Sequence, residues 1–408
     1  MKSFEIPSKY RSGFIGKVKA HVKLSDPRKQ NLEPAELNFG EFTLILPRHF
    51  GFCYGVENAI EIAYKAVREN PGKRIFLISQ MIHNPVVNTD LLEMGIQFLM
   101  DTDGSQLVPW SELEEGDIVL IPAFGTTLEI EEILRSRRVE IENYNTTCPF
   151  VEKVWKRSSE IGTKGYTIII HGKSKHEETR ATFSHASEAA PSIVIRNIDE
   201  AKLLGEFVMG TRNSEGFFEL FKGKYSDGFS PERDLQRVGV VNQTTMLATE
   251  TQEIADYFKS LMEKKHGEEY RTFFADTRDT LCYATNDNQD ATRAVLSSNA
   301  DIAIVVGGYN SSNTAQIHTI LSSAYPSFFI EGADAIQSQS EMNHFLYDLQ
   351  KRVSGKWLPE KTHPRIILTS GASCPDRLVD EVMMKIKSLF PNSLEPNEVF
   401  SNYIDLQS

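Results

Sequence analysis

The sequence predicts an α/β fold built from parallel sheets, and three observations support this. Short runs rich in isoleucine and valine recur along the chain, and amphipathic segments separate them. Continuous apolar strands that alternate with helices are typical of parallel sheets covered on both faces. Small polar turns with glycine follow several of these runs, at the sheet edge where open α/β sheets bind their ligands.

The alternation begins at Phe42, after an amino-terminal extension without clean periodicity. Residues 202–235 interrupt it and are interpreted as an insertion with helical pieces around residues 217–221, and the tail after Pro391 has no readable pattern. Apolar runs predict strands at residues 42–46, 74–78, 118–121, 166–170, 238–241, 302–306, 327–330 and 365–368. Helical spacing of apolar residues predicts helices at 56–68, 150–161, 249–264 and 315–321.

Length and charge limit the classes of protein to consider. A chain of 408 residues can form two or three domains with cores of their own. Its net charge of −12 disfavours a broad surface for nucleic acid or anionic membrane. No apolar run approaches the roughly 18 to 20 residues of a membrane span, and the amino terminus lacks the apolar core of a secretory signal. We therefore expect a cytoplasmic protein, or a plastid stromal one if residues 1–30 are a transit segment.

Three of the four cysteines, Cys53, Cys148 and Cys282, stand at the entrance to helix-like segments. With no close pairs, the cysteines predict reduced thiols in a reducing compartment. Backbone N–H groups at a helix entrance favour a thiolate, which supports one interpretation, a shared metal or cluster site. The other interpretation is that the three cysteines are small buried apolar side chains. If they are ligands, three separated thiolates fit a cubane iron–sulfur cluster with one open iron better than a closed four-ligand zinc site.

Candidate substrate groups follow the predicted strands. The loop from Gly307 to Thr314 offers backbone donors, hydroxyls and an amide before a helix-like segment, a pattern that grips phosphate but also occurs in ordinary turns and caps. His83 and Ser373 are weaker signals alone. His176 with Glu178 is a stronger one, because it combines a donor for phosphate with a carboxyl group that can carry a proton.

Taken in order from about Phe42 to Asp376, eight short motifs resemble the 4-hydroxy-3-methylbut-2-enyl diphosphate reductase family. So many motifs in register make the resemblance highly specific. The motifs are Gly51-Phe52-Cys53-Tyr54-Gly55-Val56, His83-Asn84-Pro85, Thr146-Thr147-Cys148-Pro149, His176-Glu177-Glu178-Thr179, Asn242-Gln243-Thr244-Thr245, Cys282-Tyr283-Ala284-Thr285, Asn310-Ser311-Ser312-Asn313 and Ser370-Gly371-Ala372-Ser373.

The resemblance implies three α/β domains in pseudo-threefold arrangement around a central [4Fe–4S] cluster, one per subunit, held by Cys53, Cys148 and Cys282. The domains would span residues 42–147, 148–281 with the insertion near 205–235, and 282–376. An extension, residues 1–41, would precede them, and a C-terminal helix and tail, residues 377–408, would follow.

The implied reaction is the last step of the methylerythritol phosphate pathway of isoprene biosynthesis. The substrate's allylic hydroxyl would bind the open iron. Two electrons and two protons would then remove this hydroxyl as water, giving isopentenyl and dimethylallyl diphosphates. By position in the motifs, Glu178 would donate the proton, Thr244 would relay it or orient the hydroxyl, and an electron carrier such as ferredoxin or flavodoxin would supply electrons. The diphosphate contacts would be His83, His176, Ser311, Ser312, Asn313 and Ser373.

Two residues depart from the common pattern of the family. Phe124 stands where many bacterial members carry a histidine that binds diphosphate, and in this it resembles the plant and cyanobacterial branch. Cys374 follows Ser373 at a position where small residues are usual. We interpret Cys374 as a non-ligand. Two other functions remain open: a cluster-dependent hydro-lyase that consumes no electrons, and an iron–sulfur sensor or carrier, which would not need the proton-relay residues Glu178 and Thr244.

Overall fold

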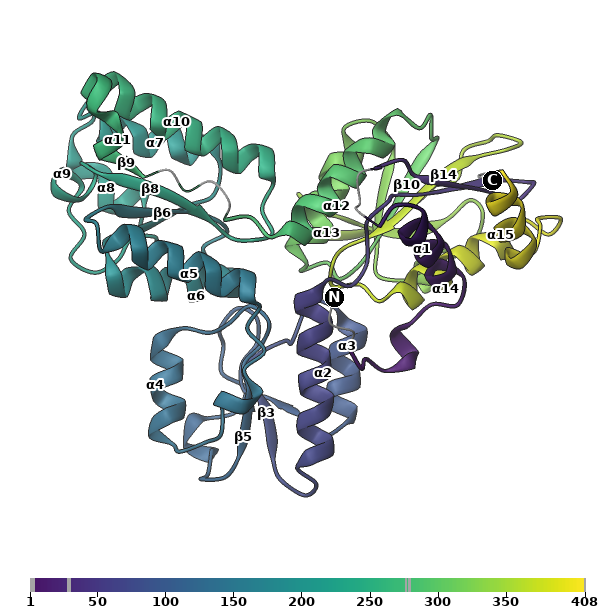
Figure 1. The fold of residues 1–408 in the computed structure, drawn as a ribbon, viewed down its shortest axis with the longest axis horizontal. Helices are drawn as coiled ribbons and strands as arrows, with labels where there is room; N and C mark the ends of the chain where they lie inside the picture. Colours follow the sequence, from purple (N-terminus) through teal and green to yellow (C-terminus); the bar gives the residue numbers. More distant parts are fainter. Residues whose placement is uncertain (1–3, 28–30, 276, 278–279, 407–408) are drawn as a thin grey trace. The chain divides into compact units, whose positions relative to one another are not determined.

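The computed structural model describes residues 4–27, 31–275, 277 and 280–406 of the 408-residue chain (Figure 1). The chain forms two compact units. Unit 1 comprises Met1–Glu57, His83–Val86 and Tyr283–Ser408, and unit 2 comprises Asn58–Ile82 and Val87–Cys282. Both ends of the chain therefore belong to unit 1.

Unit 1 is built on a five-stranded sheet in the order β1-β2-β14-β10-β11. Only β1 is antiparallel to its neighbour, and the other pairings are parallel. A separate antiparallel hairpin, β12 with β13, follows β11 in the chain. The strands are β1 (Ala35–Asn38), β2 (Thr43–Leu46), β10 (Ile302–Val306), β11 (Ser327–Ile330), β12 (Met342–Leu346), β13 (Lys351–Gly355) and β14 (Arg365–Ser370).

Alternate residues of these strands enter two cores on opposite faces of the sheet. Leu44 and Leu368 pack with apolar residues of α1, α14 and α15, whereas Ile45 and Ile367 pack with those of α13. Both faces are covered, as the apolar strands of a parallel sheet require. The helices of unit 1 are α1 (Phe14–Ser25), α12 (Tyr283–Ala294), α13 (Ser312–Ser322), α14 (Asp376–Ser388) and α15 (Pro396–Asp405).

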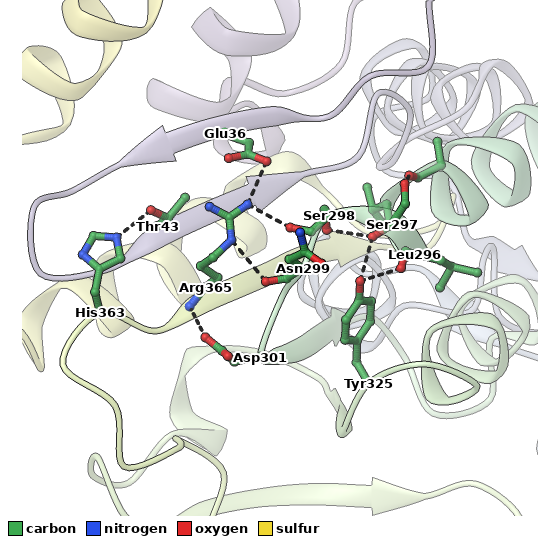
Figure 2. Close-up of polar contacts among 12 residues, drawn as sticks. Glu36, Thr43, Leu296, Ser297, Ser298, Asn299, Asp301, Tyr325, His363 and Arg365 are labelled. Carbon is green, nitrogen blue, oxygen red and sulfur yellow. Dashed lines mark hydrogen bonds and ion pairs between the residues drawn. The ribbon is translucent and has the colours of Figure 1, made fainter.

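A polar network at the start of β14 ties strands from both ends of the chain together (Figure 2). The Arg365 guanidinium donates to Glu36 Oε1 in β1 at 2.8 Å and to the carbonyl of Asn299 at 3.2 Å. Its backbone N–H donates to Asp301 Oδ2 at 2.8 Å. Because β1 comes from the amino-terminal extension, this network fixes the extension to the sheet.

Unit 2 contains two sheets in which every pairing is parallel, in the orders β4-β3-β5 and β7-β6-β8-β9. Its strands are β3 (Ile75–Leu77), β4 (Gln97–Phe98), β5 (Ile118–Leu120), β6 (Thr167–His171), β7 (Ser192–Ile195), β8 (Val238–Asn242) and β9 (Phe274–Ala275). Its helices are α2 (Tyr54–Glu69) and α3 (Pro85–Glu93), which both begin in unit 1, α4 (Leu128–Ser136), α5 (Pro149–Gly162), α6 (Glu177–Ala189), α7 (Ile198–Val208), α8 (Phe217–Leu220), α9 (Pro231–Asp234), α10 (Ala248–His266) and α11 (Tyr270–Phe273).

The predicted α/β class and the predicted strands and helices are confirmed, with ends that differ by at most three residues. The start of the interruption at residue 202 is wrong, because α7 continues to Val208, whereas the helical piece near Phe217 is present as α8. The pseudo-threefold arrangement and the three domain boundaries stay predictions. Over the described ranges, the structure has no helix that is both long and apolar enough to cross a membrane.

Candidate active site

Each of the three candidate ligand cysteines directly precedes a helix. Cys53 comes before α2, Cys148 is the N-cap of α5, and Cys282 comes before α12. All four cysteines lie among the described residues, and none forms a disulfide. The predicted position at a helix entrance is therefore confirmed for all three, and free thiols can ligate a metal once they lose their protons.

In unit 1, the Cys53 backbone is held on the turn after β14. Its N–H donates to the Ala372 carbonyl at 3.3 Å, and its own carbonyl accepts from the N–H of Glu57 in the first turn of α2 at 3.0 Å. Burial raises the pKa of the Cys53 thiol, while the backbone N–H groups of Val56 and Gly55 act in the opposite direction. These N–H groups at the start of α2 favour the thiolate.

The other two candidate ligands belong to unit 2. Cys148 donates its N–H to the Ala123 carbonyl at 3.0 Å, and Pro149 occupies the first position of α5, where a missing N–H costs nothing. Cys282 is 9% exposed. Within the described part of either unit, no three His, Cys, Asp or Glu side chains form a ready-made metal site. The predicted ligand set is divided over the two units, so the cluster stays a proposal.

Cys374 differs from the other three cysteines. Its side chain is fully buried in the core of unit 1, with Leu378 and Val379 in the same apolar cluster. Burial raises the pKa of the Cys374 thiol well above its ordinary value. A thiol in this environment behaves as a small apolar side chain, which supports its interpretation as a non-ligand.

The phosphate-type loop after β10 ends in a well-formed helix cap. Ser311 is the N-cap of α13, and its Oγ accepts from the N–H of Thr314 at 3.3 Å and from the Thr314 hydroxyl at 2.9 Å. From the turn after β14, the Ser373 hydroxyl reaches Ser311 Oγ at 3.3 Å and the His83 carbonyl at 3.1 Å. The structure thus brings three predicted diphosphate contacts together within unit 1.

Two further side chains of this loop retain unused donors. Ser312 Oγ and Asn313 Nδ2 are buried and have no hydrogen-bond partner among the residues that the structure describes. The Asn313 carbonyl oxygen accepts from the N–H of Ala372 at 2.8 Å, which fixes the direction of its amide group. Because buried polar atoms nearly always have partners, two unused donors at a helix N-terminus fit an anionic ligand such as a diphosphate.

His83 lies close to this loop through its backbone. A Cβ atom on Gly308 would lie 2.6 Å from the His83 carbonyl oxygen, so only glycine permits this approach. Asn84 then caps α3, its Oδ1 accepting from the N–H of Val86 at 3.1 Å. The backbone at His83 and directly after it is therefore fixed.

In unit 2, Glu178 is a buried carboxyl in the first turn of α6 and is 1% exposed. Its Oε1 accepts from the backbone N–H of Thr244 at 2.5 Å, in the turn after β8. Burial raises the pKa of Glu178 from 4.5 to about 7, although the hydrogen bonds from Thr244 oppose that rise. A carboxyl that is about half protonated at neutral pH can act as a general acid.

His176 is the N-cap of the same helix. Its Nδ1 accepts from the N–H of Glu178 at 3.2 Å, so the proton of the neutral imidazole is on Nε2, which can donate to a phosphate oxygen. Phe124 makes an edge-on contact with this ring at 5.7 Å between centroids. Phe124 therefore packs against the imidazole of His176, a predicted diphosphate contact, and has no group of its own that could donate to the ligand.

Two supporting contacts were not predicted from the sequence. The Gln243 amide oxygen accepts from the Thr179 hydroxyl at 3.0 Å, which joins the first turn of α6 to the turn that carries Thr244. The Ser79 hydroxyl, after β3, donates to the buried Glu177 carboxylate. The sequence does show a second glutamate, Glu177, next to the catalytic candidate Glu178. It does not show the partner of Glu177, which lies 98 residues away in the sequence.

The sequence matches one known protein family over most of its length. The family described as LytB protein matches residues 44–387 of the chain. This chain belongs to the LytB family. The match includes every predicted site residue, and the LytB family assignment agrees with the resemblance predicted from the eight motifs.

Curated LytB relatives carry one enzyme name. The protein of Trichodesmium erythraeum is 37% identical over 387 residues, covering 93% of this chain and 94% of the relative. That of Picosynechococcus sp. is 38% identical over 384 residues, covering 92% and 93% respectively. Both are named 4-hydroxy-3-methylbut-2-enyl diphosphate reductase, and both organisms are cyanobacteria, as the predicted branch requires.

Two solved structures share the fold. The E-1-hydroxy-2-methyl-but-2-enyl-4-diphosphate reductase from Plasmodium falciparum aligns with a TM-score of 0.62 at 20% identity, covering 90% of this chain and 99% of the other. A structure of (E)-4-hydroxy-3-methyl-but-2-enyl diphosphate reductase, described as the terminal enzyme of the non-mevalonate pathway, aligns with a TM-score of 0.50 at 23% identity, covering 85% and 99%.

Proposed function

We propose that this chain reduces (E)-4-hydroxy-3-methylbut-2-enyl diphosphate to isopentenyl and dimethylallyl diphosphates, releasing the allylic oxygen as water. Membership of the LytB family and the shared name of the two cyanobacterial relatives support this reaction. The observation in the structure that carries the proposal is the buried Glu178 carboxyl with its pKa of about 7. A reductive dehydroxylation at neutral pH needs such a proton source, because hydroxide is a poor leaving group.

The donor set fits an iron–sulfur cluster. Cys53, Cys148 and Cys282 are free thiols directly before a helix, whereas Cys374 lies in the apolar core of unit 1. We propose that these three hold a [4Fe–4S] cluster, which when bound supplies the electrons and a Lewis-acidic iron. The electrons would come from a small carrier such as ferredoxin or flavodoxin.

We propose donors for the diphosphate in the α13 loop and at the start of α6. In unit 1, Ser312 Oγ and Asn313 Nδ2 supply the unused donors of the α13 loop, while Ser311 and Ser373 position that loop and His83 adds its imidazole. In unit 2, His176 would donate from Nε2. Neutral and charge-assisted donors of this kind are the usual partners of phosphate oxygens.

The proton would pass from Glu178 to the leaving oxygen. The Thr244 backbone N–H holds one carboxyl oxygen of Glu178. The Thr244 hydroxyl, on a residue only 5% exposed, is proposed to orient the substrate hydroxyl or relay the proton to it. Because both residues are buried, water is excluded; water would otherwise bring the pKa of the Glu178 carboxyl back toward its ordinary value.

The decisive experiment is anaerobic reconstitution with iron and sulfide followed by turnover with a chemical reductant. We expect consumption of two electrons per allylic diphosphate and formation of both isomeric products. Spectra of the reduced cluster with and without substrate would show one iron that responds to the ligand. Dehydration of the substrate without reductant would favour a hydro-lyase, and a reducible cluster without any turnover would favour a sensor or carrier.

A further inference from the structure

Residues 4–25 of the amino-terminal extension lie against the loop that carries Cys53. The Phe4 ring meets Tyr54 edge-on at 4.9 Å between centroids, and the Tyr10 ring meets Phe52 at 5.9 Å. Both partners are the immediate neighbours of Cys53 in the sequence. The amino-terminal extension therefore contacts the Cys53 loop, residues 49–54, on either side of the cysteine.

Lys19 of α1 is the polar centre of this contact. Its ammonium group donates to the Phe50 carbonyl at 2.8 Å and to both carboxylate oxygens of Asp376 at 2.8 and 2.9 Å. The same ammonium lies 4.7 Å from the centre of the Phe50 ring. The Lys19 and Asp376 side chains are 29% and 22% exposed, so the pair is only partly screened by solvent.

Gly51 shows how closely the loop approaches this ion pair. Its φ is +79°, and a Cβ atom at this position would lie 2.2 Å from Asp376 Oδ1 and 3.0 Å from Lys19 Nζ. Only glycine combines this backbone conformation with that clearance. The Lys19–Asp376 pair thus touches the Cys53 loop at two consecutive residues, Phe50 and Gly51.

Asp376 connects the pair to the diphosphate loop. It lies in the first turn of α14, three residues after Ser373. The turn between β14 and α14 accepts the Cys53 N–H through the Ala372 carbonyl and donates the Ala372 N–H to Asn313 Oδ1 at 2.8 Å. The ion pair therefore contacts the Cys53 loop directly, and Asp376 begins the helix that follows the turn bonded to Asn313.

Helix α1 does not depend on Lys19 for its place in unit 1. Asp380 accepts from the N–H groups of Phe14 and Ile15 at 3.3 and 3.0 Å and from the Ser12 hydroxyl. Ile15 and Val18 are buried in the core of the unit. Loss of the ammonium group should therefore loosen the Cys53 loop without detaching the helix.

We propose that Lys19 is a positioning residue that holds the Cys53 loop on α14 through its bonds to the Phe50 carbonyl and Asp376. This fixes the position of the Cys53 thiol and, through Ala372, its register with the Asn313 amide. The consequence for catalysis rests on the proposed function, but the positioning itself does not. Its experiment is therefore made first on protein without a cluster.

The test measures alkylation of each cysteine by iodoacetamide in the intact, cluster-free protein, with peptide mass spectrometry as the readout. We expect Lys19→Met, which keeps the stem over the Phe50 ring, to speed alkylation of Cys53 about tenfold, the effect of losing a charged hydrogen bond. Cys148, which lies in unit 2, should react at the wild-type rate. Asp376→Asn should reproduce the effect, and Lys19→Arg should restore most of the protection.

Lys17→Met is the matched control, because it removes the same charge from the same helix. Lys17 is exposed and bonds Asn397 of α15 at 3.3 Å, not the Cys53 loop. An unchanged Cys53 rate in Lys19→Met and Asp376→Asn, or an equal increase in Lys17→Met, would overturn the proposal. Asp376→Asn decides the question alone if Lys19→Met does not fold.

A second measurement uses the reconstituted protein. Lys19→Met should shift the reduction potential and spectrum of the cluster and lower kcat more than it raises KM, whereas Lys17→Met should change neither. If the chain shows no reductase activity but Cys53 alkylation responds as expected, the proposed function fails and the positioning role stands. If activity is present and neither alkylation nor potential responds, only the positioning role fails.

Discussion

Glu178 gives the first prediction, because its acidity depends on its surroundings. With a pKa of about 7, the wild-type carboxyl loses its proton as pH rises through neutrality, so kcat should fall above that pH. Glu178→Gln keeps the shape but cannot donate a proton. We expect kcat to fall by a factor of roughly 10² to 10⁴ and the neutral-pH limb to disappear from the rate profile.

The raised pKa of Glu178 also predicts how the stability of the fold depends on pH. The Glu178→Gln variant should lose activity but gain stability. A carboxyl whose native pKa is raised stabilises the fold fully below about pH 4.5, less as pH rises, and not at all above about 7. That difference is about 3 kcal/mol, so Glu178→Gln should gain up to this amount on the wild type between pH 4.5 and pH 8. Urea unfolding at the two pH values measures it, and a pH-independent difference would contradict the buried-acid assignment.

Ser312 and Ser311 allow binding to be separated from stability. Ser312→Ala removes a buried hydroxyl with no partner among the described residues, so stability should stay equal or rise while KM increases about tenfold. Ser311→Ala removes the cap of α13 and should cost about 1 kcal/mol of stability. Thermal melts and steady-state kinetics test the pair. A marked loss of stability in Ser312→Ala would show that its hydroxyl has a structural partner.

Residue types at the site could be predicted from sequence, but their partners could not. Cysteines before helices and a Ser-Ser-Asn loop after a strand are local patterns. The raised pKa of Glu178 depends on burial against a turn 66 residues further on, and the unused donors of Ser312 and Asn313 depend on what neighbouring atoms already bond. Neither quantity has a local sequence signal.

Among the elements, strands that form continuous apolar runs were predictable, and the more polar strands β1, β12 and β13 were not. β6 and β10 are buried at every position and read as continuous apolar runs. β1 alternates buried and exposed residues in a Lys- and Glu-containing stretch, and the β12–β13 hairpin is mostly polar. Helix α1 was missed although Phe14, Ile15 and Val18 have helical spacing, because they stand in a short, Lys-rich segment with few other apolar residues.

The anchoring of α6 gives a prediction for that helix as a unit. Ser79→Ala removes a donor from the buried Glu177 carboxylate in its first turn, which should cost about 1 to 3 kcal/mol. Because Glu178 follows directly, we expect kcat to fall more than KM rises. Ser136→Ala, which removes an exposed hydroxyl bonded to the Ile133 carbonyl of α4, should change neither stability nor kcat. Equal losses in both variants would contradict the anchoring role.

At the scale of the whole molecule, the proposed [4Fe–4S] cluster gives a prediction about stability. Cys53 belongs to unit 1, and Cys148 and Cys282 belong to unit 2. A cluster that binds only the native chain stabilises it by mass action, so removing iron with a chelator should lower Tm. Cys148→Ser should abolish this difference between loaded and stripped protein. Identical melts before and after iron removal in the wild type would contradict shared ligation.

In the stripped protein, the two units should respond to core damage independently. Leu368 of β14 and Ile169 of β6 are both fully buried, in separate apolar clusters of unit 1 and unit 2. Each replacement by alanine should cost about 2 to 5 kcal/mol, because a cavity remains where the side chain packed.

Hydrogen exchange followed by mass spectrometry locates the damage of each variant. Leu368→Ala should speed exchange in β2, β10 and β14 and leave β6 and β8 protected, and Ile169→Ala should do the reverse. The strands of unit 1 come from both ends of the chain, so β2 should lose protection together with β14 although about 320 residues separate them. Spread of faster exchange to both units in either variant would show that the stripped chain unfolds as a single cooperative body.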